Sequence, residues 1–342
     1  MKNKVLIGMS GGVDSAVAAL LLKNQGYDIT GAMLLLRENM ETEIADAQKI
    51  ADNIGFELVT IPLYEKFKSE VKYYFANEYL NGRTPNPCVV CNKEIKFNEL
   101  LKYADENNFD FIATGHYAKI EKCGEKYHLK KSPTNKDQTY FLYKLGQDIL
   151  SRTLFPLSDY TKDEIRAIAQ ENNLPVASKS DSQEVCFIPD NDYVSFIRGN
   201  YQDNIPEGNF VDADTNVLGR HKGIIYYTIG QRKGLGITFG KPMYVTKIDA
   251  ETNTVTLGEE GSQMSDTLIL TNVNFITDEI KEEFTADVKI RCQAKPAKAV
   301  LTPDSDKIRI KFFEKQRSVT PGQSAVIYDG ETVIGGGTIC LP

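Results

Sequence analysis

The stretch from Val5 to Leu22 constrains the fold more than any other part of the sequence. It reads VLIGMSGGVDSAVAALLL: an apolar run, a glycine-rich turn and a run of helix formers without a breaker. This order predicts a buried strand, a tight turn and a helix. The glycines let the backbone approach a ligand closely, and the free N–H groups at the start of the helix attract an anion. The stretch therefore predicts a phosphate site.

Polar side chains in the turn indicate which phosphate compound it binds. Ser10 and Ser15 can supply hydroxyl donors. The carboxylate of Asp14 repels phosphate unless a cation lies between them, which favours Mg²⁺ and a polyphosphate. The spacing fits neither the Walker A nor the GxGxxG pattern. SGGVDS instead resembles the PP-loop of the ATP pyrophosphatase superfamily, whose members cleave ATP to AMP and pyrophosphate and adenylate a carbonyl oxygen.

Strands and helices alternate through the first half of the chain. We expect strands over 29–36, 56–61 and 111–114, and helices over 44–54, 67–80 and 158–173. The alternation predicts an α/β domain with a doubly wound parallel sheet, and the PP-loop resemblance implies the adenine nucleotide alpha hydrolase-like fold. Ligands bind beyond the carboxyl ends of such strands, where Ser10, Met33 and Gly115 all fall. The sequence by itself favours Met33 as a core residue over an adenine contact.

Beyond about residue 200 helical periodicity nearly vanishes. Short alternating runs with turn signals between them predict mostly β-structure, at 243–248, 254–257 and 307–312. We expect three domains. They are a PP-loop catalytic domain over residues 1–200, a small central β-rich domain over 201–267 and a C-terminal β-barrel that contacts RNA over 268–342.

Composition and charge limit the possible partners. A formal net charge of −7 gives no sign of nucleic-acid binding from the whole chain, so RNA contacts must come from local patches. Lys307, Arg309 and Lys311 alternate with two isoleucines, which predicts one basic strand face able to follow phosphates. No signal-peptide pattern or membrane-length apolar run is present. We therefore expect a cytoplasmic protein whose six cysteines are reduced.

Two cysteines lie in a stiff segment, TPNPCVVCN, in which prolines fix the backbone. Cys91 precedes a predicted helix that carries Lys93 and Lys96, so we expect its pKa to be lowered. Cys186 follows a polar loop and is predicted to be an exposed thiol. Structural zinc would need four ligands, usually two CxxC pairs, whereas this chain has one CxxC pair and three histidines, so zinc is not favoured. A thioredoxin-like use of the CxxC pair is not favoured either, because the fold signature is different.

Two uses of the cysteines then compete. One is a nucleophile paired with a sulfur-carrying cysteine, since a persulfide needs a second thiol to release its sulfur. The other is a small buried hydrophobe, which suits Cys292, Cys340 and Cys123 but not Cys88 or Cys91.

Seven motifs complete the pattern: SGGVDS, NPCVVCNKEIKF, ATGHYA, KDQTYFL, SQEVCFIPD, GRHKGIIYYTIGQRKGLG and TPGQ. In this order they resemble the tRNA-specific 2-thiouridylase family through most of the chain. The resemblance implies that ATP adenylates O2 of the wobble uridine and that sulfur displaces AMP, giving 2-thiouridine. It also implies a tRNA substrate and a cysteine desulfurase or sulfur-relay partner, with no DNA or membrane partner.

The resemblance assigns site residues by position. It makes Cys91 the nucleophile and Cys186 the persulfide carrier, with Asp14 also catalytic. The implied ATP contacts are Gly8, Met9, Ser10, Gly11, Gly12, Val13, Asp14, Ser15, Met33 and Gly115. The implied tRNA contacts are Asn86, Pro87, Cys88, His116, Lys136, Asp137, Gln138, Arg291, Cys292 and Gln323.

Departures from the family pattern leave alternatives open. Cys88 stands where some members carry Asp, so Cys88, Cys91 and Cys186 could together hold a [4Fe–4S] cluster whose sulfide is the donor. We favour the persulfide relay. Cys292 replaces an aromatic residue and could not stack on a base. Among other functions, a small-molecule PP-loop ligase would leave the cysteine loops unexplained, and a non-enzymatic RNA-binding protein would leave SGGVDS without a role.

Overall fold

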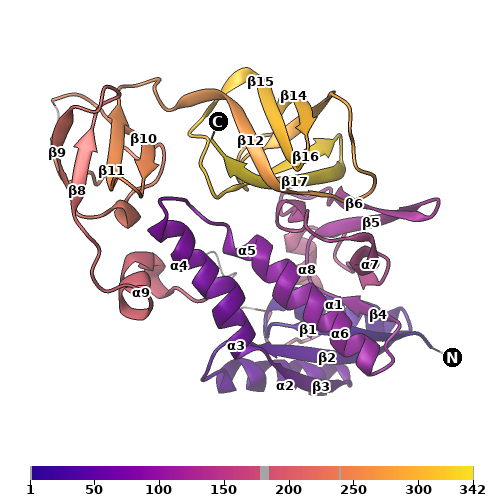
Figure 1. Ribbon diagram of the computed structural model, residues 1–342. Coiled ribbons are helices and arrows are strands. Elements are labelled where there is room, and N and C mark those ends of the chain that lie inside the picture. Colours follow the sequence, from indigo (N-terminus) through magenta and orange to yellow (C-terminus); the bar gives the residue numbers. More distant parts are fainter. Residues whose placement is uncertain (1, 178–184, 239, 342) are drawn as a thin grey trace.

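The computed structural model describes residues 2–177, 185–238 and 240–341. It has three sheets (Figure 1). A parallel sheet with its helices lies at the bottom of the view, a closed barrel lies above it, and a small sheet lies at the upper left. The predicted fold class, a parallel PP-loop domain followed by a small β-rich domain and a β-barrel, is confirmed.

The first sheet has five parallel strands in the order β3-β2-β1-β4-β7. The strands are β1 (Lys4–Met9), β2 (Asp28–Leu35), β3 (Glu57–Pro62), β4 (Phe111–Ala113) and β7 (Thr153–Leu154). The order reverses direction at β1, so the carboxyl ends of β1 and β4 form the crevice where a doubly wound sheet binds its ligand.

Both faces of this sheet are covered. Val5 and Ile7 of β1 pack in a core with helices α1, α2 and α8, whereas Leu6 between them packs in a second core with α6 and the helical segments before it. All three side chains are fully buried. A strand buried on both faces reads as a continuous apolar run, which is why the sequence signal at this strand is strong.

The helices connect the strands and extend beyond them. They are α1 (Val13–Asn24), α2 (Glu41–Ile54), α3 (Tyr64–Phe67), α4 (Tyr73–Leu80), α5 (Pro87–Val90), α6 (Asn98–Glu106), α7 (Gln147–Leu150), α8 (Lys162–Glu171) and α9 (Tyr193–Asn200). Two π-helical segments, η1 (Lys68–Lys72) and η2 (Cys91–Phe97), join neighbouring α-helices. The short 3₁₀ turns are η3 (Thr139–Phe141), η4 (Pro189–Asn191) and η5 (Ile224–Tyr226).

Helix ends follow their local sequence. Thr161 and Glu164 form a reciprocal capping box at the start of α8, as their spacing predicts. Gly55 ends α2 with φ of 82°, a conformation that favours glycine. The helix expected over 67–80 is present, but its middle widens into the π-helical η1.

The two β-rich parts differ in closure. The small sheet has the order β10-β11-β8-β9, and its strands are β8 (Gly208–Val211), β9 (Val217–His221), β10 (Tyr244–Asp249) and β11 (Thr254–Gly258). The barrel strands are β12 (Met264–Phe275), β13 (Phe284–Lys289), β14 (Ala297–Asp304), β15 (Lys307–Arg317), β16 (Ser324–Asp329) and β17 (Thr332–Cys340). Pairing of β12 with both β15 and β17 closes this six-stranded antiparallel barrel.

The barrel reaches back to the first half of the chain. A hairpin of β5 (Ala118–Cys123) and β6 (Lys126–Lys131) adds to the barrel sheet where Lys130 pairs with Thr332. This connection was not expected from the sequence. The predicted boundary at residue 267 lies inside β12. None of the helices in the described part of the chain has the length and hydropathy of a membrane span.

Candidate active site

The predicted phosphate turn lies between β1 and α1. Ser15 is buried, accepts a hydrogen bond from the Ser10 backbone N–H at 3.2 Å and donates its hydroxyl to the Gly12 carbonyl at 3.1 Å. These bonds shape the loop from within. A side chain on Gly115 would lie 2.9 Å from backbone atoms of Asp14 and Ser15, so the end of β4 approaches the loop as only glycine allows.

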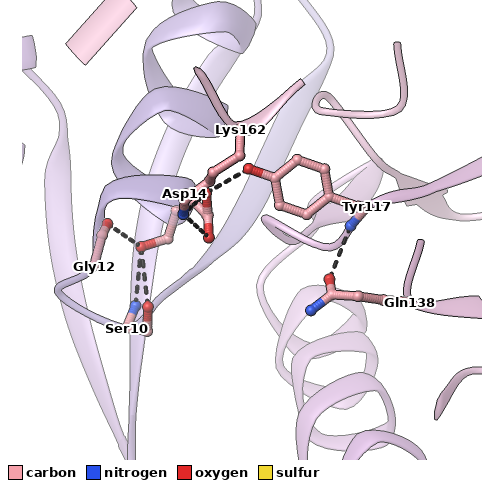
Figure 2. A network of polar contacts seen from close by, with 7 residues as sticks. Ser10, Gly12, Asp14, Tyr117, Gln138 and Lys162 are labelled. Atoms are coloured by element: carbon pink, nitrogen blue, oxygen red, sulfur yellow. Dashed lines mark hydrogen bonds and ion pairs between the residues drawn. The ribbon is translucent and has the colours of Figure 1, made fainter. Parts of the chain in front are cut away.

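Asp14 is the charged centre of a polar network (Figure 2). Lys162 of α8 places its Nζ 2.8 and 2.9 Å from the two carboxylate oxygens, and the Tyr117 hydroxyl donates to one of them at 2.7 Å. The backbone of Tyr117 in turn exchanges hydrogen bonds of 2.9 Å with Gln138. Lys162 therefore already balances the charge of Asp14 within the protein, and the expected Mg²⁺ stays a prediction.

A pocket of about 290 Å³ opens at the carboxyl ends of β1, β2 and β4. Its lining includes Gly8, Met9, Ser10, Asp14, Ser15, Met33 and Gly115 of the predicted ATP set, together with Lys96, His116 and Gln138. Met33 is only 2% exposed, so it serves the core and the pocket wall together. A larger hollow of about 550 Å³ lies beside β7 and the β5–β6 hairpin and is lined by none of the predicted site residues.

Cys91 does not have the environment that the sequence predicts. The helix already begins at Pro87, so Cys91 lies inside the helical run where α5 passes into η2, and its side chain is buried in the core. Burial raises the pKa of Cys91 to about 12, although the Lys96 ammonium acts in the opposite direction. The expected low pKa of this thiol is therefore wrong for the structure without ligands.

The three thiols expected to cooperate share one electrostatic environment. Burial is the main cause that raises the pKa values of Cys88 and Cys91, and the charge of Cys186 raises both further. Cys186 is exposed, as predicted, and burial by surrounding atoms still raises its pKa against the field of Lys96. All six cysteines lie within the described residues and are free thiols. The first part of the SQEVCFIPD motif lies outside the described residues.

The thiols do not form a metal site as they stand. Within the part of the chain that the structure describes, no three His, Cys, Asp or Glu side chains gather closely enough to hold a metal ion. The donor set of Cys88, Cys91 and Cys186 therefore does not fit an iron–sulfur cluster in this arrangement. The same holds for a magnesium site built from protein carboxylates alone.

Phe187, next to Cys186, has a packing role that sequence reasoning missed. Its ring centroid lies 5.6 Å from that of Phe67, 5.5 Å from that of Phe75 and 5.3 Å from that of Phe196. It thereby anchors the chain next to Cys186 in an aromatic cluster with residues of α3, α4 and α9. The run of large apolar residues after Cys186 was the available signal.

Several predicted tRNA contacts line one region. Asn86 and Pro87 are buried and Cys88 is exposed. His116 lies on the pocket wall, where its Nδ1 is 2.8 Å from the Thr114 hydroxyl, and burial lowers its pKa well below the usual value. The charge of Cys292, which belongs to the barrel domain, also contributes to the raised pKa of Cys88.

The segment from Lys136 to Gln138 is held by the fold. Lys136 is exposed, and Gln138 lines the pocket. The Asp137 carboxylate accepts hydrogen bonds from Ser132 and Thr139, at 2.8 Å for the Thr139 hydroxyl. Burial raises its pKa even so. Asp137 therefore shapes the turn, and its contact with tRNA stays a prediction.

Barrel residues of the predicted RNA set also have partners within the protein. Arg291 donates to the Ser318 carbonyl and, at 2.9 Å, to the Thr320 hydroxyl. Gln323 donates to backbone carbonyls of the loop that precedes Cys88. Along β15, Lys307, Arg309 and Lys311 are exposed and the isoleucines between them are buried, as the alternation predicts.

The raised pKa of Cys91 makes its reactivity depend on pH. We expect its alkylation by iodoacetamide in the free protein to rise about tenfold per pH unit between about pH 7 and pH 10, because the thiolate fraction keeps growing below the pKa. Peptide mass spectrometry would follow Cys91 beside the exposed Cys123. A Cys91 rate that bends near about pH 8.5 and levels off by about pH 9.5, as an ordinary thiol gives, would contradict this.

Comparison with known proteins accounts for the whole chain. Three family models match in sequence order. They are described as a tRNA methyl transferase HUP domain over residues 3–190, a tRNA methyl transferase PRC-barrel domain over 195–259 and an aminomethyltransferase beta-barrel domain over 265–339. Among solved structures, NMN synthetase from Francisella tularensis is similar at 19% identity and a TM-score of 0.34, over 52% of this chain and 66% of that one, which carries no argument.

Curated relatives match along their full length. The tRNA-specific 2-thiouridylase MnmA 1 of Clostridium botulinum (Loch Maree) is 49% identical over 354 residues, covering 99% of each chain. The tRNA-specific 2-thiouridylase MnmA of Clostridioides difficile is 50% identical over 355 residues, covering 99% of this chain and 98% of its own. With this identity and coverage, the chain belongs to the MnmA family of tRNA-specific 2-thiouridylases.

Proposed function

We propose that this chain is a tRNA sulfurtransferase that converts the wobble uridine, position 34, to 2-thiouridine. Lys96 carries the proposal, because it lines the nucleotide pocket and its charge lowers the pKa values of Cys88, Cys91 and Cys186 against the effect of burial. One side chain thus links the predicted ATP site to the predicted sulfur chemistry. The full-length relatives named 2-thiouridylases support the same reaction.

The first step would activate the base. A uracil carbonyl is a poor electrophile, so O2 of the uridine attacks the α-phosphorus of ATP, forming an O2-adenylate and releasing pyrophosphate. The base must leave the anticodon stack to reach the pocket. The N–H groups at the start of α1 face the phosphates. Because Lys162 balances Asp14, Mg²⁺ would enter with the nucleotide, whose phosphates would supply its oxygen ligands.

The second step would transfer sulfur. The terminal sulfur of a persulfide on Cys186 attacks C2, and AMP leaves with the former O2. The Cys91 thiolate then attacks the Cys186 sulfur, forming a disulfide and releasing the 2-thiouridine. An external thiol reductant reduces this disulfide, and a cysteine desulfurase or sulfur-relay protein reloads Cys186. We propose the thiol relay rather than the cluster route because the three thiols do not gather as metal ligands among the described residues.

One assay tests the function. Unmodified tRNA, ATP, Mg²⁺, a sulfur donor and the protein are incubated, and the RNA is digested for nucleoside analysis. We expect 2-thiouridine together with equal amounts of AMP and pyrophosphate. Omission of ATP or of the donor should remove the product. AMP and pyrophosphate formed without tRNA, but with a small carboxylic acid or amide precursor, would favour a small-molecule ligase instead.

A further inference from the structure

The barrel turn that contains Pro321 and Gln323 forms hydrogen bonds with the loop that precedes Cys88 and Cys91. The Thr84 backbone N–H donates to the Pro321 carbonyl at 2.9 Å. In return, Nε2 of Gln323 donates to the carbonyls of Thr84 and Pro85, each at 3.0 Å. The two Gln323 bonds join residues that are 239 and 238 positions apart in the chain.

The turn lies directly against the loop backbone. Gly322 between these contacts has φ of +88°, and a side chain there would lie 2.9 Å from the Thr84 carbonyl oxygen and 3.0 Å from its nitrogen. Only glycine fits both the conformation and the space. The contact therefore combines a close backbone approach at Gly322 with two hydrogen bonds from the Gln323 side chain.

The helical segment beyond the loop needs such support. Its first part, α5, is a single turn, and Cys91 begins the π-helical η2, a conformation that is rare and often marks a functional site. Asn92, the next residue, is 3% exposed, and among the described residues its Oδ1 is a buried polar atom without a hydrogen-bond partner. Such an atom costs stability, so contacts outside the segment must help to fix its position.

We propose that Gln323 is a positioning residue, which holds the start of the segment that carries Cys88 and Cys91. The proposal rests on the proposed function for its catalytic meaning. It differs from the expectation that Gln323 contacts tRNA, because its amide nitrogen is already engaged by two loop carbonyls. Through this turn the barrel becomes part of the catalytic apparatus.

The test is Gln323→Ala, studied first in the free protein without ATP or tRNA. We expect Cys91, which is buried, to be alkylated at least about fivefold faster, because the segment opens more often once two hydrogen bonds are lost. Cys123 is exposed and lies in the β5–β6 hairpin, outside the cysteine segment, so its alkylation rate is the internal reference. In the thiolation assay kcat should fall about tenfold, while KM for ATP and Kd for tRNA stay within about twofold of wild type.

Gln316→Ala is the matched control. This barrel glutamine is equally half-buried, but its Nε2 donates at 2.9 Å to Glu314 of its own strand. We expect it to leave every readout unchanged. Gln323→Met keeps the side-chain length without the donors and should reproduce Gln323→Ala. It is measured in its place if the alanine variant does not fold, as judged by circular dichroism.

Two results would overturn the proposal. If Gln323→Ala weakened tRNA binding while Cys91 kept its wild-type alkylation rate, Gln323 would be an RNA contact. If neither the alkylation rate nor tRNA binding changed, Gln323 would not position the cysteine segment. Since alkylation needs no substrate, a wild-type protein that fails to thiolate tRNA would refute the proposed function and leave the alkylation result standing by itself.

Discussion

Cys91→Ser and Cys186→Ser should each reduce thiolation by more than about 10³-fold, the scale expected when a nucleophile is removed from a covalent mechanism. A serine hydroxyl can neither carry a persulfide nor release one. Cys186 is exposed and can be reached by a donor, whereas Cys91 is buried. Both variants should still release pyrophosphate in the presence of tRNA and ATP, because adenylation does not use the thiols.

The controls distinguish the relay from a cluster. Cys123→Ser and Cys340→Ser change exposed thiols outside the proposed chemistry and should have almost no effect. Cys88→Ser should keep activity within about fivefold of wild type under the relay, but should abolish it if three thiols hold iron. Iron and sulfide counts with an anaerobic spectrum provide a second measure. Full thiolation by Cys186→Ser would remove the relay.

Features that depend on neighbouring residues could be predicted from the sequence. The strand, turn and helix around SGGVDS, the capping box at Thr161 and the basic face of β15 all follow from short-range spacing. Met33 and Gly115 could be placed in one pocket with the turn because the carboxyl ends of parallel strands meet at one edge. Each of these inferences needs only local geometry and the handedness of the fold.

The pKa of Cys91 could not be predicted in the same way. Reading the helix from Cys91 put the thiol at a helix N-terminus, where its pKa would fall. The helix starts earlier because proline is well suited to its first turn, and Pro87 occupies that place. Cys91 then turns into the core, and desolvation outweighs the nearby lysine. The prolines carried this signal, but the packing that buries the thiol comes from distant segments.

Long-range pairings were also beyond the sequence. The β5–β6 hairpin joins the barrel through Lys130 and Thr332, and Gln323 reaches the Cys88 loop. No local pattern marks either partner. The same is true of Asp14 and Lys162, which are 148 residues apart. A carboxylate in a phosphate loop indicated a missing cation, and the sequence offered no way to identify this lysine among many.

Lys162→Met should lower the affinity for ATP by roughly 10- to 100-fold, because it leaves an unbalanced carboxylate beside the triphosphate. The Lys162 side chain is only 10% exposed, which strengthens the pair, but that of Asp14 is 34% exposed, so water moderates the loss. Equilibrium dialysis at several Mg²⁺ concentrations measures this. We expect binding by the variant to depend more steeply on Mg²⁺, since the ion must then supply the missing positive charge.

Two further variants isolate the charge. Tyr117→Phe removes the 2.7 Å bond to Asp14 but leaves the ion pair, so it should cost about tenfold at most. Asp14→Asn in the Lys162→Met background removes the unbalanced charge and should restore part of the ATP affinity. This recovery is a coupling between two residues in contact, as a double-mutant cycle measures it. If Lys162→Met bound ATP like the wild type, Lys162 would not be the counter-charge, and the case for a metal ion at Asp14 would return.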